Sequence, residues 1–372
     1  MRRIALALVL LLVAGAAAAD VSLVERNSVH QKAAKGKPGR PGHTNATGSM
    51  ALIDQQGMKY FINTNITFST TSSASGAASE ASYTHAVAAS TLNGGTTSST
   101  LNDSYDGYNT MCLSLNNTVV NCETGNANFV IFNKNGPATT ECLGATSGVN
   151  RQVVFPVQTS GSIQMQRKVF VPDNDQFARW LNYFTNTGAT PQTVTAVIAN
   201  NLGSDSNTII VNDSNNNTTP DTTVTWVTTF QNFSGTTTTD PRLGHVLQGG
   251  SGNPAVHLSG ISFQNGNDNP FWGYTFTLAP GETKIIMNFG VNQPTKAAAN
   301  SKSAALALLP ANALQCLTTA EQGEIANFQA IVPIATVPAL STTGLAALAL
   351  LLAGAALFEV RRRSANRKPA QP

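Results

Sequence analysis

Histidines are the residues of this chain best suited to proton transfer, and the stretch from residue 44 to residue 358 contains only His85, His245 and His257. A nucleophile or general base would need a serine, cysteine or carboxylate placed beside one of them. The sequence has no Gly-x-Ser-x-Gly, Ser-x-x-Lys or His-Glu-x-x-His motif that would place such groups together. Arg242, His245 and His257 are candidates for a polar pocket, but isolated histidines on strands are usually hydrogen-bonded structural residues. We therefore predict that the chain is not an enzyme.

Oxygen-rich turns are the second feature that could bind a ligand, because Ca²⁺ takes six to eight oxygen ligands. These turns contain Asp103 and Asp106, residues 173–175, Asn201 with Asp205 and Asn207, and residues 267–269. None of them matches the EF-hand loop or the nonapeptide repeat. Asp and Asn also cap turns through their own side chains. Turn capping is the prevailing interpretation; a structural calcium ion is the alternative, and no other cofactor is predicted.

Aromatic side chains are the third candidate, because a row of exposed rings can stack on sugars. The candidates are Trp180, Trp226, Phe271, Trp272 and Tyr274. Trp272 and Tyr274 would share one face of a strand, with Phe271 on the other, so at least one set belongs to the core. Core packing is the default role of such residues.

Four cysteines predict two disulfides in an exported chain. Residues 116–118 could form a short hairpin loop that places Cys112 opposite Cys122, within the reach of a disulfide. Cys142 and Cys316 would then connect a helical segment to the sheet. A metal site is disfavoured, because no Cys-x-x-Cys pair or neighbouring His pair is present.

The region from residue 50 to residue 294 is poor in charge and consists of short apolar or alternating runs separated by turn residues. The runs are 59–68, 129–132, 152–157, 163–171, 177–185, 192–199, 208–211, 222–230, 256–263, 271–278 and 283–291. Many short strands with such turns predict an all-β protein. We expect either one large sandwich or two sandwiches in series with a seam near residues 144–150.

Two strands of this body flank an Asn-Thr-Gly turn at residues 186–188, within a loop that ends at Pro191. This segment resembles the Asn-Thr-Gly hairpin of bacterial surface β-sandwiches and the super-sandwich domains of carbohydrate-active proteins. Neither resemblance identifies active-site residues.

A helical segment follows at residues 295–330. Residues 295–309 favour a helix that Pro310 would stop, and Thr318 with Glu321 forms a capping box that opens a second helix to about residue 329. We expect both helices to pack at one end of the sandwich.

The body is mildly acidic although the whole chain is basic. Lys and Arg total 22 against 19 Asp and Glu, but residues 44–358 hold 10 bases and 16 acids, a net charge of −6. This balance argues against a nucleic-acid partner.

The first 19 residues have the layout of a secretory signal peptide. Arg2 and Arg3 precede an apolar run at residues 4–13, and small residues end at Ala19 before Asp20. We therefore expect export through the secretion machinery with cleavage between Ala19 and Asp20. Residues 20–49 are basic and lack an apolar period, which predicts a disordered linker.

An uncharged apolar run at residues 344–358 predicts a transmembrane helix over residues 344–360. Residues 340–343 extend it toward the ~20 residues that cross a bilayer. The basic residues that follow the run are Arg361, Arg362 and Arg363. Such a cluster stays on the cytoplasmic side, so we expect a cytoplasmic tail at residues 361–372 and the preceding chain outside. The alternative is a buried core helix.

The residues before this run form a short motif. They are Val337, Pro338, Ala339, Leu340, Ser341 and Gly344. Together with the apolar run and the arginines, they resemble the IPTL-type C-terminal sorting signal of Gram-negative bacteria. The resemblance implies recognition of residues 331–343 by an exosortase-like membrane transpeptidase, which would cut near the motif and remove the helix.

These expectations combine into one prediction. The chain would be exported, tethered to the inner membrane before processing, and then delivered to the outer membrane, cell surface or extracellular space. There it would have a structural or adhesive role, with envelope polysaccharide as a candidate partner. The alternative is a carbohydrate-binding or carbohydrate-active extracellular domain.

Overall fold

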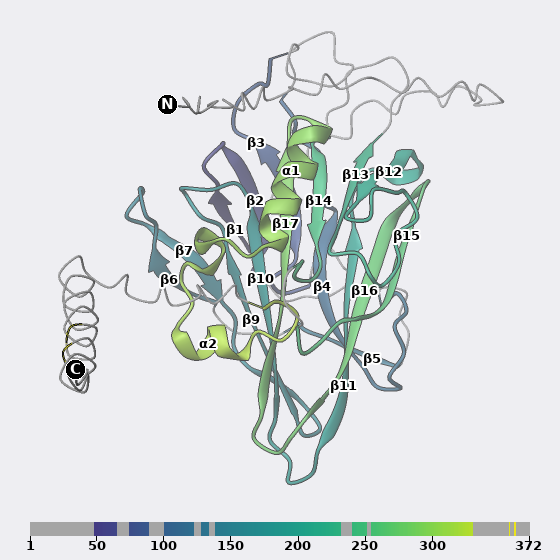
Figure 1. The fold of residues 1–372 in the computed structure, drawn as a ribbon. Helices are drawn as coiled ribbons and strands as arrows, with labels where there is room; N and C mark the ends of the chain where they lie inside the picture. The colour runs from purple at the N-terminus through teal and green to yellow at the C-terminus, as the bar shows by residue number, and fades with distance from the viewer. Residues whose placement is uncertain are drawn as a thin grey trace, which may run out of the picture. The chain divides into compact units, whose positions relative to one another are not determined.

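The computed structural model describes residues 48–64, 74–88, 100–122, 128–133, 138–231, 240–250 and 254–329, together with Leu357 and Arg361. The chain divides into two compact units, Met1–Ala330 and Ile331–Pro372. All the elements named below belong to the first unit, which is mostly β-structure (Figure 1).

The first sheet has the strand order β1-β2-β3-β4-β11-β16-β15, with β5 paired to β4 beside this path. Its strands are β1 (Ser49–Ile53), β2 (Met58–Asn63), β3 (Ala78–Tyr83), β4 (Gly107–Ser114), β5 (Phe129–Ile131), β11 (Gln192–Asn201), β15 (Leu258–Gln264) and β16 (Asn267–Leu278). Its neighbouring strands pair antiparallel.

The second sheet has the order β12-β13-β14-β17-β10-β9-β7-β6, with β8 paired to β9. Its strands are β6 (Thr139–Leu143), β7 (Asn150–Val154), β8 (Gln158–Ser160), β9 (Ile163–Phe170), β10 (Ala178–Asn186), β12 (Thr208–Asp213), β13 (Trp226–Gln231), β14 (Arg242–Val246) and β17 (Thr283–Gln293). These strands are antiparallel as well.

The two sheets form one sandwich rather than two in series. The expected seam at residues 144–150 is the connection of a hairpin, because β6 and β7 pair with each other and Leu143 lies opposite Asn150. Strands from both sides of the seam also share the first sheet, where β11 pairs with β4. Of the two architectures predicted, the single large sandwich is therefore the one observed.

The main core lies between the sheets and follows the two-residue period of the strands. On β10, Trp180 and Phe184 belong to this core, whereas Leu181 and Tyr183 belong to a second cluster on the other face of the sheet. On β9, Met165 is fully buried and its neighbours Gln164 and Gln166 are half-buried, as the alternating sequence predicted.

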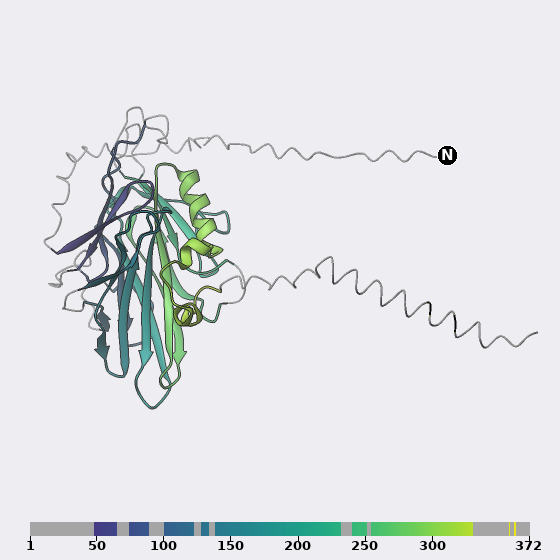
Figure 2. The same ribbon diagram turned by 90° about the vertical axis from the view of Figure 1, so that its left-hand side faces the viewer.

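Two helices cover the outer face of the second sheet. Helix α1 (Lys296–Ala307) contacts β13, β14 and β17, and helix α2 (Thr319–Glu324) contacts β17 (Figures 1 and 2). The expectation that the helices pack at one end of the sandwich is therefore wrong. The reason is the apolar outer face of β17, whose Met287, Phe289 and Val291 need cover from solvent.

Helix α2 begins as predicted and ends early. The side chain of Thr318 accepts from the backbone N–H of Glu321, and the Glu321 side chain accepts from the N–H of Thr318, which is the predicted capping box. The helix stops at Glu324 because Ile325 is extended and pairs with Ile285 of β17. The predicted continuation to residue 329 is replaced by this pairing.

Both predicted disulfides are present, Cys112–Cys122 and Cys142–Cys316. The hairpin expected to bring Cys112 and Cys122 together is not formed, since the strand opposite Cys112 is β5, with Ile131 as its partner. Cys122 instead belongs to an irregular loop that crosses the outer face of the first sheet. In that loop Val119 packs over Gly260 and Gly273, where the missing side chains leave room.

The predictions for the two ends of the chain lie outside the described residues. These are the signal peptide at 1–19 with its cleavage site, the motif from Val337 to Gly344, the transmembrane helix at 344–360 except Leu357, the basic tail except Arg361, and the linker at 20–49 up to residue 47. The last residue of that predicted linker is corrected by the structure, because Ser49 begins β1 and pairs with Asn63. Within the part of the chain that the structure describes, no helix has the length and apolar character that a bilayer crossing requires.

Candidate functional site

His245 is buried between the sheets and has no solvent-facing nitrogen. Its Nδ1 lies 3.0 Å from the hydroxyl of Tyr108, and its Nε2 lies 2.9 Å from the hydroxyl of Thr229. Burial lowers the pKa of His245 from 6.5 to about 3, so the ring is neutral at physiological pH. A neutral ring with both nitrogens hydrogen-bonded is a structural residue rather than an accessible general base.

The predicted pocket of Arg242, His245 and His257 does not form. Arg242 lies on the other face of β14, with its guanidinium 4.6 Å from the ring of Phe230, whereas His245 belongs to the interior. The side chains of His85 and His257 are exposed.

The aromatic residues proposed as a sugar-stacking platform belong to the core. Trp180, Trp272 and Tyr274 are fully buried, and Trp226 is 8% exposed beneath the outer-face cluster. The half-buried Phe271 packs against the cluster formed by the Cys112–Cys122 disulfide and β11. Core packing, the default interpretation of these residues, is thus confirmed.

The oxygen-rich turns use their side chains as caps. The carboxylate of Asp173 accepts from the backbone N–H groups of Thr146 and Ser147 at 3.0 and 2.5 Å. Asn201 and Asn267 accept from the N–H two residues ahead, each at 2.9 Å. No group of three or more His, Cys, Asp or Glu side chains suited to a metal ion occurs among the described residues.

A polar depression of about 210 Å³ lies on the outer face of the second sheet, beside α2. Its lining residues come from the β7–β8 connection, β9, β10, β17 and the end of α2: Val157, Gln164, Met165, Gln166, Tyr183, Thr185, Thr283 and Glu324. We take this depression as the candidate binding site.

The floor of the depression is set by strand register. Tyr183 lies opposite Gln166, and Thr185 lies opposite both Gln164 on β9 and Thr283 on β17. The hydroxyls of Thr185 and Thr283 are 2.8 Å apart. Three paired strands therefore hold these polar groups in one rigid layer.

The wall is formed where α2 gives way to an extended segment. The N–H of Ala326 donates to the carbonyl of Ile285 at 2.9 Å, and the Asn327 side chain accepts from the N–H of Met287 at 2.9 Å. These bonds fix residues 325–327 along β17. They also place Glu324, the last residue of α2, beside the floor.

Charges next to the depression are paired through Lys168. Its ammonium lies 2.9 Å from Glu141 and 2.8 Å from Glu321, and Glu321 also accepts from the Tyr183 hydroxyl at 2.5 Å. Burial disfavours the charged form of Glu321, but the bonds from Lys168, Tyr183 and the N–H of Thr318 prevail and lower its pKa from 4.5 to about 2. The pKa of Glu324 is raised by its burial and by the charge of Glu321.

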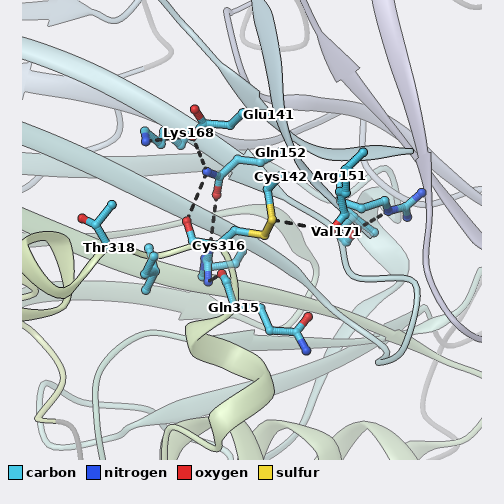
Figure 3. The surroundings of a disulfide bond; sticks show 12 residues. Glu141, Cys142, Arg151, Gln152, Lys168, Val171, Gln315, Cys316 and Thr318 are labelled. Atoms are coloured by element: carbon cyan, nitrogen blue, oxygen red, sulfur yellow. Dashed lines mark hydrogen bonds and ion pairs between the residues drawn. A yellow bond between two sulfur atoms is a disulfide. The ribbon is translucent and has the colours of Figure 1, made fainter. Parts of the chain in front are cut away.

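The Cys142–Cys316 disulfide fastens this corner of the fold. It connects β6 to the chain just before α2, and the Gln152 amide beside it donates to Glu141 at 2.7 Å (Figure 3). The buried Arg179 guanidinium donates to the carbonyls of Ala313 and Gln315 at 2.6 and 2.7 Å. The segment that carries α2 is therefore held to the sheet by covalent and charged bonds.

The arrangement supplies groups that can bind a polar ligand. It offers amides, hydroxyls, part of one tyrosine ring and one carboxylate, most of which are hydrogen-bonding groups. Part of the lining could have been found from the sequence, because Gln164 and Gln166 alternate with buried residues on β9 and must therefore face outward. The position of Glu324 in the lining could not be found from the sequence. It depends on the pairing of Ile325 with Ile285 of β17, in a segment whose sequence predicts a helix.

The sequence matches no family model and no curated protein. Solved structures with weak similarity include a polysaccharide lyase, with 13% identity, a TM-score of 0.34, and coverage of 70% of this chain and 35% of the lyase. A heparan sulfate lyase from Pedobacter heparinus has 13% identity and a TM-score of 0.28, over 45% of this chain and 23% of its own. A galactose mutarotase-like protein from Lactobacillus casei has 9% identity and a TM-score of 0.33, over 66% of this chain and 99% of its own.

This chain thus spans about a third or less of the length of the two lyases. The names of all three proteins refer to carbohydrates or carbohydrate enzymes. At these identities and TM-scores, the similarities assign neither a family nor an activity to this chain.

Proposed function

We propose that this chain is an exported β-sandwich protein, sorted to the cell surface, with a structural or adhesive role. The observation that carries the proposal is the pair of disulfides, Cys112–Cys122 and Cys142–Cys316, each of which restrains an irregular segment against a sheet. Disulfides of this kind persist in oxidising compartments, which supports a location outside the cytoplasm.

The distribution of reactive groups also supports a role without catalysis. His245 is buried with both nitrogens bonded, and the tryptophans lie in the core. What the sandwich presents to solvent is mainly Thr, Ser, Asn and Gln, side chains that hydrogen-bond without reacting. The protein would act through this surface once an exosortase-like transpeptidase had released it from its C-terminal tether.

Deletion of residues 337–372 tests the sorting part of the proposal. In the native host, the full chain should undergo a mass loss that matches removal of the C-terminal helix and should fractionate with the envelope or the medium. The deletion variant should not be processed and should reach a different fraction. A variant with Ser364→Ala alone, in the tail but outside the motif and the arginine cluster, serves as the control. The same location and the same mature mass with and without the tail would contradict the proposal.

A second test concerns the disulfides in the cell. Alkylation of the protein as it is recovered, followed by mass measurement, should detect no free thiols until a reductant is added. Four alkylated cysteines in the unreduced sample would place the chain in a reducing compartment and overturn the proposal.

Carbohydrate binding is the second candidate function, and the polar depression beside α2 is the observation that favours it. Amides, hydroxyls and a carboxylate around one aromatic ring are the groups with which proteins bind sugars. Saturable binding of the full-length protein to oligosaccharides on a glycan array is the expected result. A protein with correct disulfides that binds no glycan would leave the structural role as the only candidate.

A further inference from the structure

We propose that the depression lined by Gln164, Gln166, Tyr183, Thr185, Thr283 and Glu324 is a binding site for a single neutral, hydroxyl-rich sugar unit, such as the end of an oligosaccharide chain. The proposal rests on the second candidate function above and adds the site, the residues and the ligand class.

The first reason is that two polar side chains at the site have no partner within the described part of the chain. The amide of Gln164 and the carboxylate of Glu324 line the depression and make no hydrogen bond or ion pair to described groups. By contrast, the neighbouring Gln166 amide donates to the carbonyl of Phe155 at 3.3 Å. An unengaged amide offers both a donor and an acceptor, and a carboxylate can accept from two hydroxyls. This combination suits a ligand with adjacent hydroxyl groups.

The second reason is that the floor is preorganised. The Thr185 and Thr283 hydroxyls bond to each other, so their remaining lone pairs and one proton have fixed directions. The Tyr183 phenol is engaged by Glu321, and the Lys168 ammonium lies 5.9 Å from the ring centroid, so Tyr183, which is 8% exposed, presents only a small part of its ring to a ligand. Because its hydroxyl is held in place, this exposed part can contact a C–H group of a sugar without losing rotamer freedom.

The third reason is charge. Lys168 lies beside the site, and its ammonium is shared by Glu141 and Glu321. With Glu324 and the buried Arg179, whose charge acts on Tyr183 and Glu321, the corner holds two positive and three negative side chains, a net charge of −1. Uronic acids, sulfated sugars and phosphates would be repelled. The hydroxyls of a neutral sugar can donate hydrogen bonds to the Glu324 carboxylate without electrostatic repulsion.

The fourth reason is size. The depression has a volume of about 210 Å³, which is below the ~300–1,000 Å³ typical of sites for drug-sized ligands. One sugar ring fits this space, and a longer chain would extend over the polar outer face of β9 and β10. We therefore expect weak binding by one unit rather than a groove for a polymer.

The test is calorimetric titration of the full-length protein with a panel of neutral oligosaccharides and with matched oligosaccharides that carry uronic acids. At least one neutral sugar should bind. Glu324→Gln and Gln164→Ala should each weaken that binding about tenfold, because each removes a hydrogen bond to a ligand hydroxyl. Gln322→Ala is the control: Gln322 is exposed on α2, and its amide bonds the carbonyl of Leu317 outside the lining.

Melting temperature and near-ultraviolet circular dichroism verify that each variant keeps its fold. Binding of a neutral sugar that both variants retain would overturn the site while leaving the carbohydrate-binding function in place. Tighter binding of the uronic-acid series would overturn the ligand class. Absence of binding to every sugar would overturn the site and the second candidate function together, while the structural role is judged separately by the location of the chain.

Discussion

Lys168 of β9 and Glu321 of α2 form an ion pair in which Nζ and Oε1 are 2.8 Å apart. Both side chains are mostly buried, at 15% and 11% exposed. The Tyr183 hydroxyl donates to the same oxygen of Glu321, so a helix of six residues is joined to two strands of the sheet through one carboxylate. This carboxylate also closes the capping box of the helix.

The first prediction concerns acid stability at Glu321. Its pKa is about 2 in the fold against 4.5 ordinarily, so ionised Glu321 stabilises the fold above about pH 4.5 and this contribution is lost as the pH falls toward 2. Glu321→Gln should lower the free energy of unfolding at pH 7 by roughly 1–3 kcal/mol and flatten its decline between pH 4.5 and 2. Urea unfolding from pH 2 to pH 7 measures both effects.

Glu282→Gln is the matched control, because Glu282 pairs with Lys284 at a more exposed position and should change the free energy of unfolding little. If Glu321→Gln kept the wild-type stability and the wild-type slope in acid, the ion pair would not stabilise the attachment of the helix.

The second prediction compares the two disulfides. Cys142–Cys316 joins residues 174 positions apart, and Cys112–Cys122 joins residues 10 positions apart. On the chain-entropy account, loss of Cys142–Cys316, which closes the longer loop, should lower the free energy of unfolding by about 5 kcal/mol. Loss of Cys112–Cys122, which closes the shorter loop, should lower it by about 3 kcal/mol. Guanidinium unfolding of the two Cys-to-Ser double variants measures the difference. A larger loss for the Cys112–Cys122 pair would show that the packing of the loop over the first sheet outweighs loop length.

The alternating pattern and the capping signals were sufficient to predict much of this fold. Met165 and Gln166 on β9 face opposite sides as their types require, and Thr318 with Glu321 opens α2 where the capping box predicts. Disulfide pairing could be predicted too, although the hairpin invoked for Cys112 was wrong. The loop with Cys122 depends on two glycines of distant strands, Gly260 and Gly273, whose small size has no local signature.

The candidate site was harder to foresee, because its wall is made by a long-range contact. Local propensity continues α2 to about residue 329, whereas the pairing of Ile325 with Ile285 ends it at Glu324. The packing of both helices on a sheet face rather than at an end has a similar cause. It follows from the apolar outer side of β17, which becomes apparent only once β17 is known to be central in its sheet.

The third prediction concerns Glu80, a buried acid on β3. Its pKa is raised from 4.5 to about 9, chiefly by burial and further by the charges of Asp103 and Asp106, against backbone hydrogen bonds from Ser104 and Ala81. The folded state therefore holds a proton that the unfolded state releases, so stability should fall as the pH rises from about 4.5 toward 9. Glu80→Gln keeps the shape without the titration, and at pH 8 it should stabilise the fold by more than about 1 kcal/mol, since one pKa unit corresponds to about 1.4 kcal/mol.

Thermal and urea unfolding at pH 5 and pH 8 test this prediction. Asp54→Asn should act in the same direction over a lower range, because the pKa of Asp54 rises from 3.8 to about 7 through burial. Equal destabilisation by Glu80→Gln at both pH values would mean that Glu80 is ionised in the fold.

The fourth prediction concerns the close approach of α1 to β14. A Cβ atom at Gly244 would collide with the Ser303 hydroxyl, while its next contact, the Cβ of Val291, lies at 3.1 Å. Gly244→Ala should therefore push the helix outward and cost roughly 1–3 kcal/mol. The Ser303 hydroxyl is buried and has no hydrogen-bond partner among the described residues, so Ser303→Ala alone should be neutral or stabilising. In the double variant, Ser303→Ala removes the colliding atom and should restore most of the stability lost in Gly244→Ala. Urea unfolding of the two single variants and the double variant gives this recovery as a coupling energy. Additive effects of the two substitutions would show that Gly244→Ala disturbs the backbone of β14 rather than the packing of α1 against it.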